Sequence, residues 1–363
     1  MRQNLKRKAV EESGPIDRMV EEAFHATDHQ WQSKDLIVNL PAIRTMKNTL
    51  QKQRRKTRPP IPHTIEKLPF PLPDAYCKTA HDDQFLFYDG PLGDIRSLIF
   101  CSYNDLLYLS QHEDWYCDGT FYTCPSIFYQ IYSIHVYHDG ISTPCIFALL
   151  GSKSEVVYND LFTKNYPTVI VRGCLFHYGQ RLFRKFVDLG LKVSYNNDEN
   201  LRDWFRSFAA LSLLPLNHML WGLQYLIQNR PEYPGIQEFL TYYHTTYGPF
   251  SKFPPHMYNH YRNITPRTIN YLEGRHSRMK KHVNAPHPNI YIVIDLLKKE
   301  QSLASMTRIR DDMGAPTRKR RKNKVITDEF LLKLWQRYDE SHLDIPAFLK
   351  AAGLRYFQRP SKR

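Results

Sequence analysis

The chain has 363 residues, of which 42% are hydrophobic and 13% aromatic, enough to fill one large core or two to three ordinary ones. Fifty Lys and Arg against 36 Asp and Glu give a net charge of +14, which favours a polyanionic partner, first nucleic acid and second a membrane surface. The sequence has no uninterrupted apolar run of about 18 residues and no apolar segment behind the basic start Met1–Lys8, so it predicts neither a membrane span nor a secretory signal.

The cysteines are scattered among apolar neighbours, and none forms a Cys-x-x-Cys pair. They are Cys77, Cys101, Cys117, Cys124, Cys145 and Cys174. This pattern indicates small buried side chains in a reducing compartment, and it implies neither a disulfide framework nor a self-contained zinc finger.

Residues 1–58 are predicted to form a basic helical N-terminal region. Asp17 can cap a helix that runs to Phe24, and a second helix is expected from Leu40 to Lys56. The end of this second helix carries a basic cluster, which consists of Lys47, Lys52, Arg54, Arg55, Lys56 and Arg58. Three interpretations of the cluster stay open: a solvated helix face, a contact with DNA phosphates, and a nuclear import signal.

Residues 59–75 are rich in proline and show no periodicity, which predicts an extended linker. From residue 76 to 199 the pattern is that of an α/β core with a mixed sheet. Strands are expected at 84–88 and 95–100, followed by a short helix at 104–112. Three more strands, at 115–121, 128–137 and 141–150, form an antiparallel meander.

The second half of this core region is predicted to contain two helices with a strand between them. Ser154 caps a helix that runs to Phe162, and Thr168–Val171 is expected to be a buried strand. The segment Leu175–Leu189 has the spacing of an amphipathic basic helix.

The rest of the chain is predicted to be helical. Residues 200–264 form a helical insertion in which Trp204 and Trp221 are expected in the core. Residues 265–310 return to the α/β core with a helix at 268–282, which bears Glu273, and residues 311–363 form a basic linker and C-terminal helices. The run Arg318–Lys322 in that linker is either an import signal or a solubilising segment.

Asp118 is a single carboxylate inside a strand that is otherwise built for burial. A lone acid in such a place costs several kcal/mol unless something pairs with it, so Asp118 is a candidate metal ligand. The alternative is that Asp118 ends an edge strand and caps the turn at Gly119. The element order, a meander followed by a helix, a strand and a distant acidic helix, is the order expected of a ribonuclease H-like core.

Three blocks of the sequence resemble the Mutator-like element transposases, over roughly residues 40 to 310. They are Asp118-Gly119-Thr120-Phe121 with Phe128-Tyr129-Gln130 and Ile134-His135, then Gly173-Cys174-Leu175-Phe176-His177-Tyr178, and then Arg267-Thr268-Ile269-Asn270-Tyr271-Leu272-Glu273-Gly274 with His276. The resemblance implies a nuclear cut-and-paste DNA transposase that cleaves and joins DNA. It also implies an Asp, Asp, Glu triad that holds two Mg²⁺ or Mn²⁺ ions, with Asp118 as the first acid and Glu273 as the third.

The chain departs from this family at the second acid. The family places that Asp on a strand between the helix predicted at 154–162 and the Cys/His block, but here the two are too close for a further strand and helix. Asp160 is the nearest acid, and it belongs to the preceding helix. The resemblance therefore implies a transposase-derived protein with impaired catalysis, unless an exon with the second acid is missing from this sequence. The alternatives are a domesticated, non-catalytic nuclear DNA-binding protein and a structural nuclear protein whose basic helices bind other acidic partners.

The remaining candidate residues surround the two acids. Cys174 and His177 are either structural, with Cys174 buried at the strand end and His177 hydrogen-bonded near the two acids, or half of a zinc site. His276, one turn after Glu273, is expected to orient that carboxylate or to contact phosphate, and the alternative is a surface histidine. Basic side chains on two helices are expected to contact DNA phosphates, namely Arg181, Arg184, Lys185, Arg275, Arg278, Lys280 and Lys281. The expected partner is DNA, no membrane contact is predicted, and a homo-oligomer is compatible with the sequence.

Overall fold

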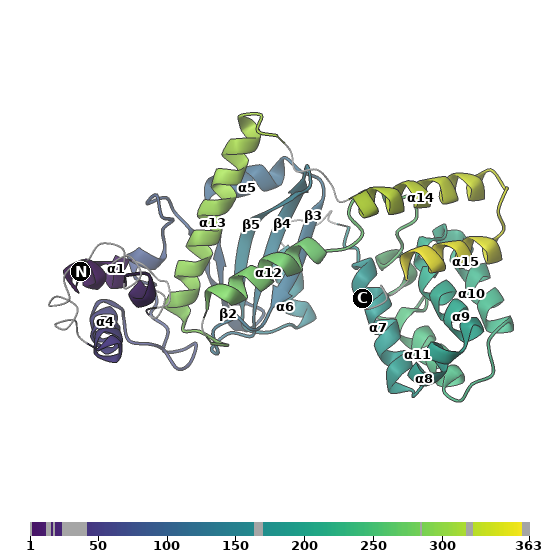
Figure 1. The fold of residues 1–363 in the computed structure, drawn as a ribbon, viewed down its shortest axis with the longest axis horizontal. Coiled ribbons are helices and arrows are strands. Elements are labelled where there is room, and N and C mark those ends of the chain that lie inside the picture. The colour runs from purple at the N-terminus through teal and green to yellow at the C-terminus, as the bar shows by residue number, and fades with distance from the viewer. Residues whose placement is uncertain are drawn as a thin grey trace, which may run out of the picture. The chain divides into compact units, whose positions relative to one another are not determined.

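The computed structural model describes residues 2–11, 16, 19–23, 42–162, 170–283, 285–316 and 322–357. The chain divides into two compact units, each built from separate stretches of sequence (Figure 1). Unit 1 comprises Met1–Thr168 and Asn270–Arg318, and unit 2 comprises Val169–Ile269 and Lys319–Arg363. The helical part therefore begins near residue 169 and includes the C-terminal helices, whereas the sequence suggested an insertion limited to 200–264.

Unit 1 contains a sheet whose described strands run in the order β1-β2-β5-β4-β3, and all neighbours are antiparallel. The strands are β1 Leu86–Leu92, β2 Ile95–Phe100, β3 Trp115–Thr120, β4 Gln130–His138 and β5 Ile141–Leu150. The predicted meander of β3, β4 and β5 is confirmed. Its second turn places Asp139 at φ 47° and Gly140 at φ 80°, the left-handed conformation that a tight two-residue hairpin turn requires.

The predicted buried strand at 168–171 is wrong where the structure describes it. Ile170 and Val171 belong to no strand and are 78% and 57% exposed, while residues 168 and 169 lie outside the described part. A β-branched run favours a strand only if a neighbouring strand supplies hydrogen bonds and burial, and none of the described strands does so for Ile170 and Val171. The fold class is mixed α/β as predicted, but a ribonuclease H-like core would be richer in parallel strands than this sheet.

Helices cover both faces of the sheet, and the alternation of side chains along β5 decides which face meets which helices. Phe147 and Leu149 pack against α12 (Asn270–His282) and α13 (Ile290–Asp312). Cys145, Ile146, Ala148 and Leu150 belong to the opposite core, with α5 (Tyr103–Ser110) and α6 (Glu155–Phe162). Figure 1 shows α12 and α13 lying across the sheet.

The proline-rich segment 59–75 is packed rather than a free linker. Leu68 and Leu72 are buried in the core under α13, and a short 3₁₀ turn follows at Asp74–Tyr76. The Arg96 side chain donates hydrogen bonds of 2.8 Å to the carbonyls of Leu68 and Pro69. Arg96 thus fixes the extended segment to β2.

The N-terminal region of unit 1 has a small core of its own. It contains α1 (Arg2–Glu11) and α4 (Ile43–Thr57), and α4 confirms the helix predicted at 40–56. Leu5 and Ala9 of α1 pack with Met46 and Leu50 of α4. Of the helix predicted from Asp17 to Phe24, the structure describes residues 19–23, which are helical.

The described residues of unit 2 form helices joined by loops, and no strand lies among them. Its helices are α7 Leu175–Asp188, α8 Lys192–Asn197, α9 Glu199–Ala209, α10 Met219–Gln228, α11 Ile236–Tyr247, α14 Lys322–Asp339 and α15 Ile345–Tyr356. Trp204 is buried in the core as predicted, but Trp221 is 56% exposed and stacks on His218. The prediction for Trp221 is wrong because α10 turns Met219, Gly222 and Leu226 inward and leaves Trp221 outside.

The basic run Arg318–Lys322 lies mostly outside the described residues. In the parts of both units that the structure describes, no helix is long and apolar enough to cross a membrane. All six cysteines are free, and three of them, Cys101, Cys124 and Cys145, are buried as expected.

Candidate functional site

Asp118 lies on β3, which is an edge strand among the described strands. Side chains alternate along a strand, so Tyr116 and Asp118 both project toward the face that α12 covers. The Tyr116 ring contacts Tyr271 of α12 edge to face, with 5.5 Å between centroids. The Asp118 carboxylate accepts a 2.9 Å hydrogen bond from the Gly119 amide through Oδ1, which leaves Oδ2 on the side of α12.

The helix α12 brings His276 to this carboxylate. His276 Nδ1 lies 3.4 Å from Asp118 Oδ2, and both side chains are largely buried. Glu273 is exposed one turn earlier on α12, and residues three apart lie on the same flank of a helix. The structure thus packs the helix that bears Glu273 against the strand that bears Asp118. The side chain of this helix that contacts the Asp118 carboxylate is His276.

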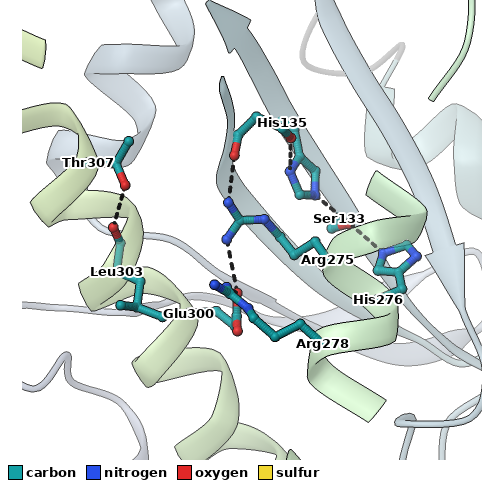
Figure 2. A network of polar contacts seen from close by, with 9 residues as sticks. Ser133, His135, Arg275, His276, Arg278, Glu300, Leu303 and Thr307 are labelled. Carbon is teal, nitrogen blue, oxygen red and sulfur yellow. Dashed lines mark hydrogen bonds and ion pairs between the residues drawn. The ribbon is translucent and has the colours of Figure 1, made fainter. Parts of the chain in front are cut away.

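A line of polar contacts continues from His276 into the sheet (Figure 2). His276 Nε2 lies 3.3 Å from Ser133 Oγ, and Ser133 Oγ lies 2.8 Å from His135 Nε2. The other ring nitrogen of His135 lies 3.1 Å from Ser142 Oγ. Burial lowers the pKa of His135 well below its usual value, and the neighbouring side chains of Arg275 and His276 lower that pKa further. His135 is therefore neutral, with one hydroxyl partner for each ring nitrogen.

Asp118, His276 and Ser133 follow one another in the order of an Asp-His-Ser triad, but the arrangement does not suit hydrolysis. Ser133 is 3% exposed and is also bound by His135, so its hydroxyl is not accessible to a substrate. The line of contacts instead fixes the position of the His276 ring against Asp118.

Two arginines of α12 hold the helix in place through Glu300 of α13 (Figure 2). Arg275 Nη1 lies 3.0 Å from Glu300 Oε2, and Arg275 Nη2 donates to the Ser142 carbonyl at 2.6 Å. Arg278 pairs with the same Glu300 oxygen, and Glu300 is 1% exposed. Burial lowers the pKa of Arg275, and Glu300 opposes that shift. Because Arg275 is only 15% exposed, its charge serves this internal pair more than an external phosphate.

The other predicted DNA contacts lie at the surface of both units. Lys280 and Lys281 are exposed near the end of α12, and Lys280 Nζ sits 4.2 Å from the centroid of the Tyr122 ring. In unit 2, α7 exposes Arg181 and Arg184, while Lys185 is half-buried against Tyr242.

Cys174 and His177 lie at the start of α7, in unit 2. Cys174 is the residue before the first turn of the helix and is half-buried, so the expectation that it is buried at a strand end is wrong. Burial alone would raise the pKa of the Cys174 thiol, but hydrogen bonds from His177 and the backbone outweigh it, and the pKa is lowered. This pair supplies two donors of the four that a structural zinc site needs.

The described donors do not fit a two-metal site. Within the described ranges, no group of three or more His, Cys, Asp or Glu side chains is placed to hold a metal ion. Asp160 accepts a 2.7 Å hydrogen bond from the Gly93 amide in the turn between β1 and β2, which agrees with its exclusion as a ligand. The Mg²⁺ or Mn²⁺ ions implied by the resemblance stay a prediction.

Comparison with models of protein families, with curated proteins and with solved structures found no match. The site is therefore interpreted from its own geometry.

Sequence reasoning missed Ser133, His135, Ser142 and Glu300. Ser133 and His135 did carry a signal, because two polar residues at positions i and i+2 of an apolar strand lie on one face. Glu300 carried no such signal, because it follows two lysines in a polar segment whose sequence is that of a solvent-exposed helix.

Proposed function

We propose that this chain derives from a cut-and-paste DNA transposase with a ribonuclease H-like core and acts in the nucleus as a DNA-binding protein. The observation that carries the proposal is the placement of α12 against β3. It sets His276, one turn after Glu273, at the Asp118 carboxylate on the first strand of the meander. Two blocks far apart in the sequence thus meet as a transposase core would require.

Electrostatics support DNA as the partner. The chain carries a net charge of +14, and exposed cations lie on α12 and α7, among them Lys280, Lys281, Arg181 and Arg184. Cations of this kind bind phosphates without reading sequence, and each phosphate contact releases counterions.

One observation favours a non-catalytic form of this function. His276 lies against the Asp118 oxygen that a metal would bind, and among the described residues Asp118 belongs to no group of three or more His, Cys, Asp or Glu side chains that could hold a metal ion. Catalysis by two metals depends on carboxylates that hold both ions. Strand cleavage is accordingly expected to be weak or lost, while DNA binding is retained.

A single set of measurements on the full chain tests both parts. DNA affinity is measured against salt, and a phosphate-binding surface predicts that log affinity falls linearly with log salt, by about 0.9 per phosphate contact. A flat salt dependence contradicts the DNA-binding proposal.

Plasmid cleavage with Mn²⁺ is then compared for wild type, Asp118→Ala, Glu273→Ala and the exposed control Glu232→Ala. Cleavage that is lost only in the first two variants supports a surviving nuclease. Equal background signals in all four proteins, together with salt-dependent binding, support the non-catalytic form.

A further inference from the structure

The helix α4 differs in charge from a typical solvated helix. Its sequence IRTMKNTLQKQRRKT contains no Asp or Glu, and its cations are Arg44, Lys47, Lys52, Arg54, Arg55 and Lys56. A solvated face usually mixes both signs, as in α14, whose sequence KNKVITDEFLLKLWQRYD includes Asp328, Glu329 and Asp339. The absence of acids from α4 therefore indicates that its exposed face binds a polyanionic partner.

Helix stability explains only part of this charge. Arg54, Arg55 and Lys56 stand in the last turn, where the helix dipole favours cations, but Arg44 does not. A cation in the first turn opposes the helix dipole, and Arg44 is the second residue of α4. No acidic residue lies in that first turn, and Ala42 provides no side-chain cap. Arg44 is thus placed against the preference of the helix itself.

The buried stripe of α4 determines which residues face outward. Met46 and Leu50 are buried against Leu5 and Ala9 of α1. At about 100° per residue, Asn48 is about 200° around the helix from Met46 and so lies at the centre of the outer face. Arg44, Gln51 and Lys52 flank Asn48 at helical spacing, and all four side chains are exposed.

This outer face has the donors and acceptors of a base-reading surface. Asn and Gln amides can bind the two groups that adenine presents in the major groove, while Arg and Lys bind guanine or phosphate. The major groove of B-form DNA is about 12 Å wide and admits a helix of about 10–12 Å diameter. The deep, narrow major groove of an RNA helix does not admit one, so double-stranded DNA is the partner that fits.

The end of α4 is anchored within unit 1. Arg58, the residue after the helix, donates to Asp295 of α13 at 2.9 Å, and both side chains are largely buried. A helix that is already held in place loses less conformational entropy on binding than a mobile one, which favours binding to DNA.

We propose that α4 is the base-reading helix of this protein. It enters the major groove of double-stranded DNA with Asn48 and Gln51 on base edges and with Arg44 and Lys52 on the flanking phosphates. The inference rests on the proposed DNA-binding function and adds the element that reads sequence.

The test starts with selection of preferred duplexes from a random double-stranded DNA library by the full chain. Affinity for a selected duplex and for a scrambled one is then measured by fluorescence anisotropy. The variants are Asn48→Ala with Gln51→Ala, and Arg44→Ala with Lys52→Ala. The control removes two exposed cations from α14, through Lys333→Ala with Arg337→Ala. Far-ultraviolet circular dichroism checks that each variant stays folded.

The amide variant is expected to lower the ratio of the two affinities by about tenfold or more, because a good bidentate base contact is worth that much discrimination. The charge variant is expected to weaken both complexes equally and to reduce the salt slope by about 2. The control is expected to leave the affinity ratio unchanged.

Three results overturn the inference. One is the absence of any selected sequence, and another is an unchanged affinity ratio in the amide variant. If either result is obtained while the wild type still binds DNA in a salt-dependent way, the proposed DNA-binding function is retained. Only the assignment of α4 as the base-reading helix is then excluded. The third is the absence of DNA binding by the wild type at low salt, which overturns both proposals.

Discussion

At the scale of single residues, each unit contains a buried neutral histidine, His135 in unit 1 and His260 in unit 2. His260 Nε2 lies 2.8 Å from the Gly173 carbonyl, and Nδ1 lies 3.0 Å from the Asn263 amide nitrogen. A ring that donates at Nε2 and accepts at Nδ1 carries no charge. Burial lowers the pKa of His260 from 6.5 to about 4, the Gly173 hydrogen bond opposes this shift, and Arg267 and Arg172 add to it.

The lowered pKa predicts a loss of stability in acid. Below pH 6.5 the unfolded chain binds a proton at His260 that the folded chain does not bind until about pH 4. The free energy of unfolding therefore falls by up to about 1.4 kcal/mol per pH unit across that window. Replacing His260→Gln should remove this contribution, since glutamine can donate to Gly173 without titrating.

Urea unfolding followed by tryptophan fluorescence checks this prediction at several pH values between 7.5 and about 4. The expected result is that the difference in free energy of unfolding between the wild type and the variant becomes smaller as the pH falls. Parallel curves for the two proteins would show that His260 does not titrate as its burial indicates.

The residue scale also shows how far a sequence predicts a site. Asp118 and the helix that bears Glu273 and His276 were predicted to meet, because the resemblance to the transposases, together with the order of the elements, implied it. The roles of Ser133 and Glu300 were not predicted, because each residue meets its partner only when the sheet packs against α12 and α13. A buried ion pair depends on distant residues, whereas local spacing reports only on neighbours within about one helical turn.

At the scale of elements, two helical glycines should respond oppositely to alanine. A Cβ at Gly353 of α15 would lie 2.7 Å and 2.8 Å from the carbonyl carbon and oxygen of Arg206 in α9, whose backbone cannot move aside easily. A Cβ at Gly274 of α12 would meet nothing within 4 Å.

We therefore expect Gly353→Ala to destabilise the protein by about 1–3 kcal/mol through overpacking. Gly274→Ala should stabilise it by about 0.5–1 kcal/mol, because alanine favours the helix more than glycine does. Urea midpoints of the two variants and the wild type test the pair. A stabilising Gly353→Ala would mean that α9 and α15 do not pack closely.

The elements themselves were predicted well where an apolar run forms a strand that is buried over most of its length. The strands β2 and β5 begin and end where the pattern of the sequence places them. Prediction failed at Ile170 and Val171 and at Trp221, which are apolar side chains that the tertiary structure leaves exposed. Periodicity identifies which side chains could be buried, but the neighbouring elements decide which of them are.

At the scale of the whole molecule, unit 2 closes its core with a second stretch of chain. Its C-terminal helices α14 and α15 contribute buried side chains, namely Leu331, Leu334, Trp335, Phe348, Leu349 and Ala352. Trp335 Nε1 also donates a 2.9 Å hydrogen bond to the Leu213 carbonyl in the first stretch. The fold of 169–269 therefore depends on residues that follow unit 1 in the sequence.

Truncation after residue 318 should consequently unfold unit 2 and spare unit 1. Loss of the buried side chain of Trp335 or Phe348 alone lowers the free energy of unfolding by about 3–5 kcal/mol, which is a large part of a typical domain's stability. Limited proteolysis should then cleave within 169–269 while 42–162 with 270–316 resists, and a control that ends at residue 357 should show the wild-type pattern. Protection of 169–269 in the shorter chain would mean that the first stretch folds by itself, and that the division into two units does not describe how the protein folds.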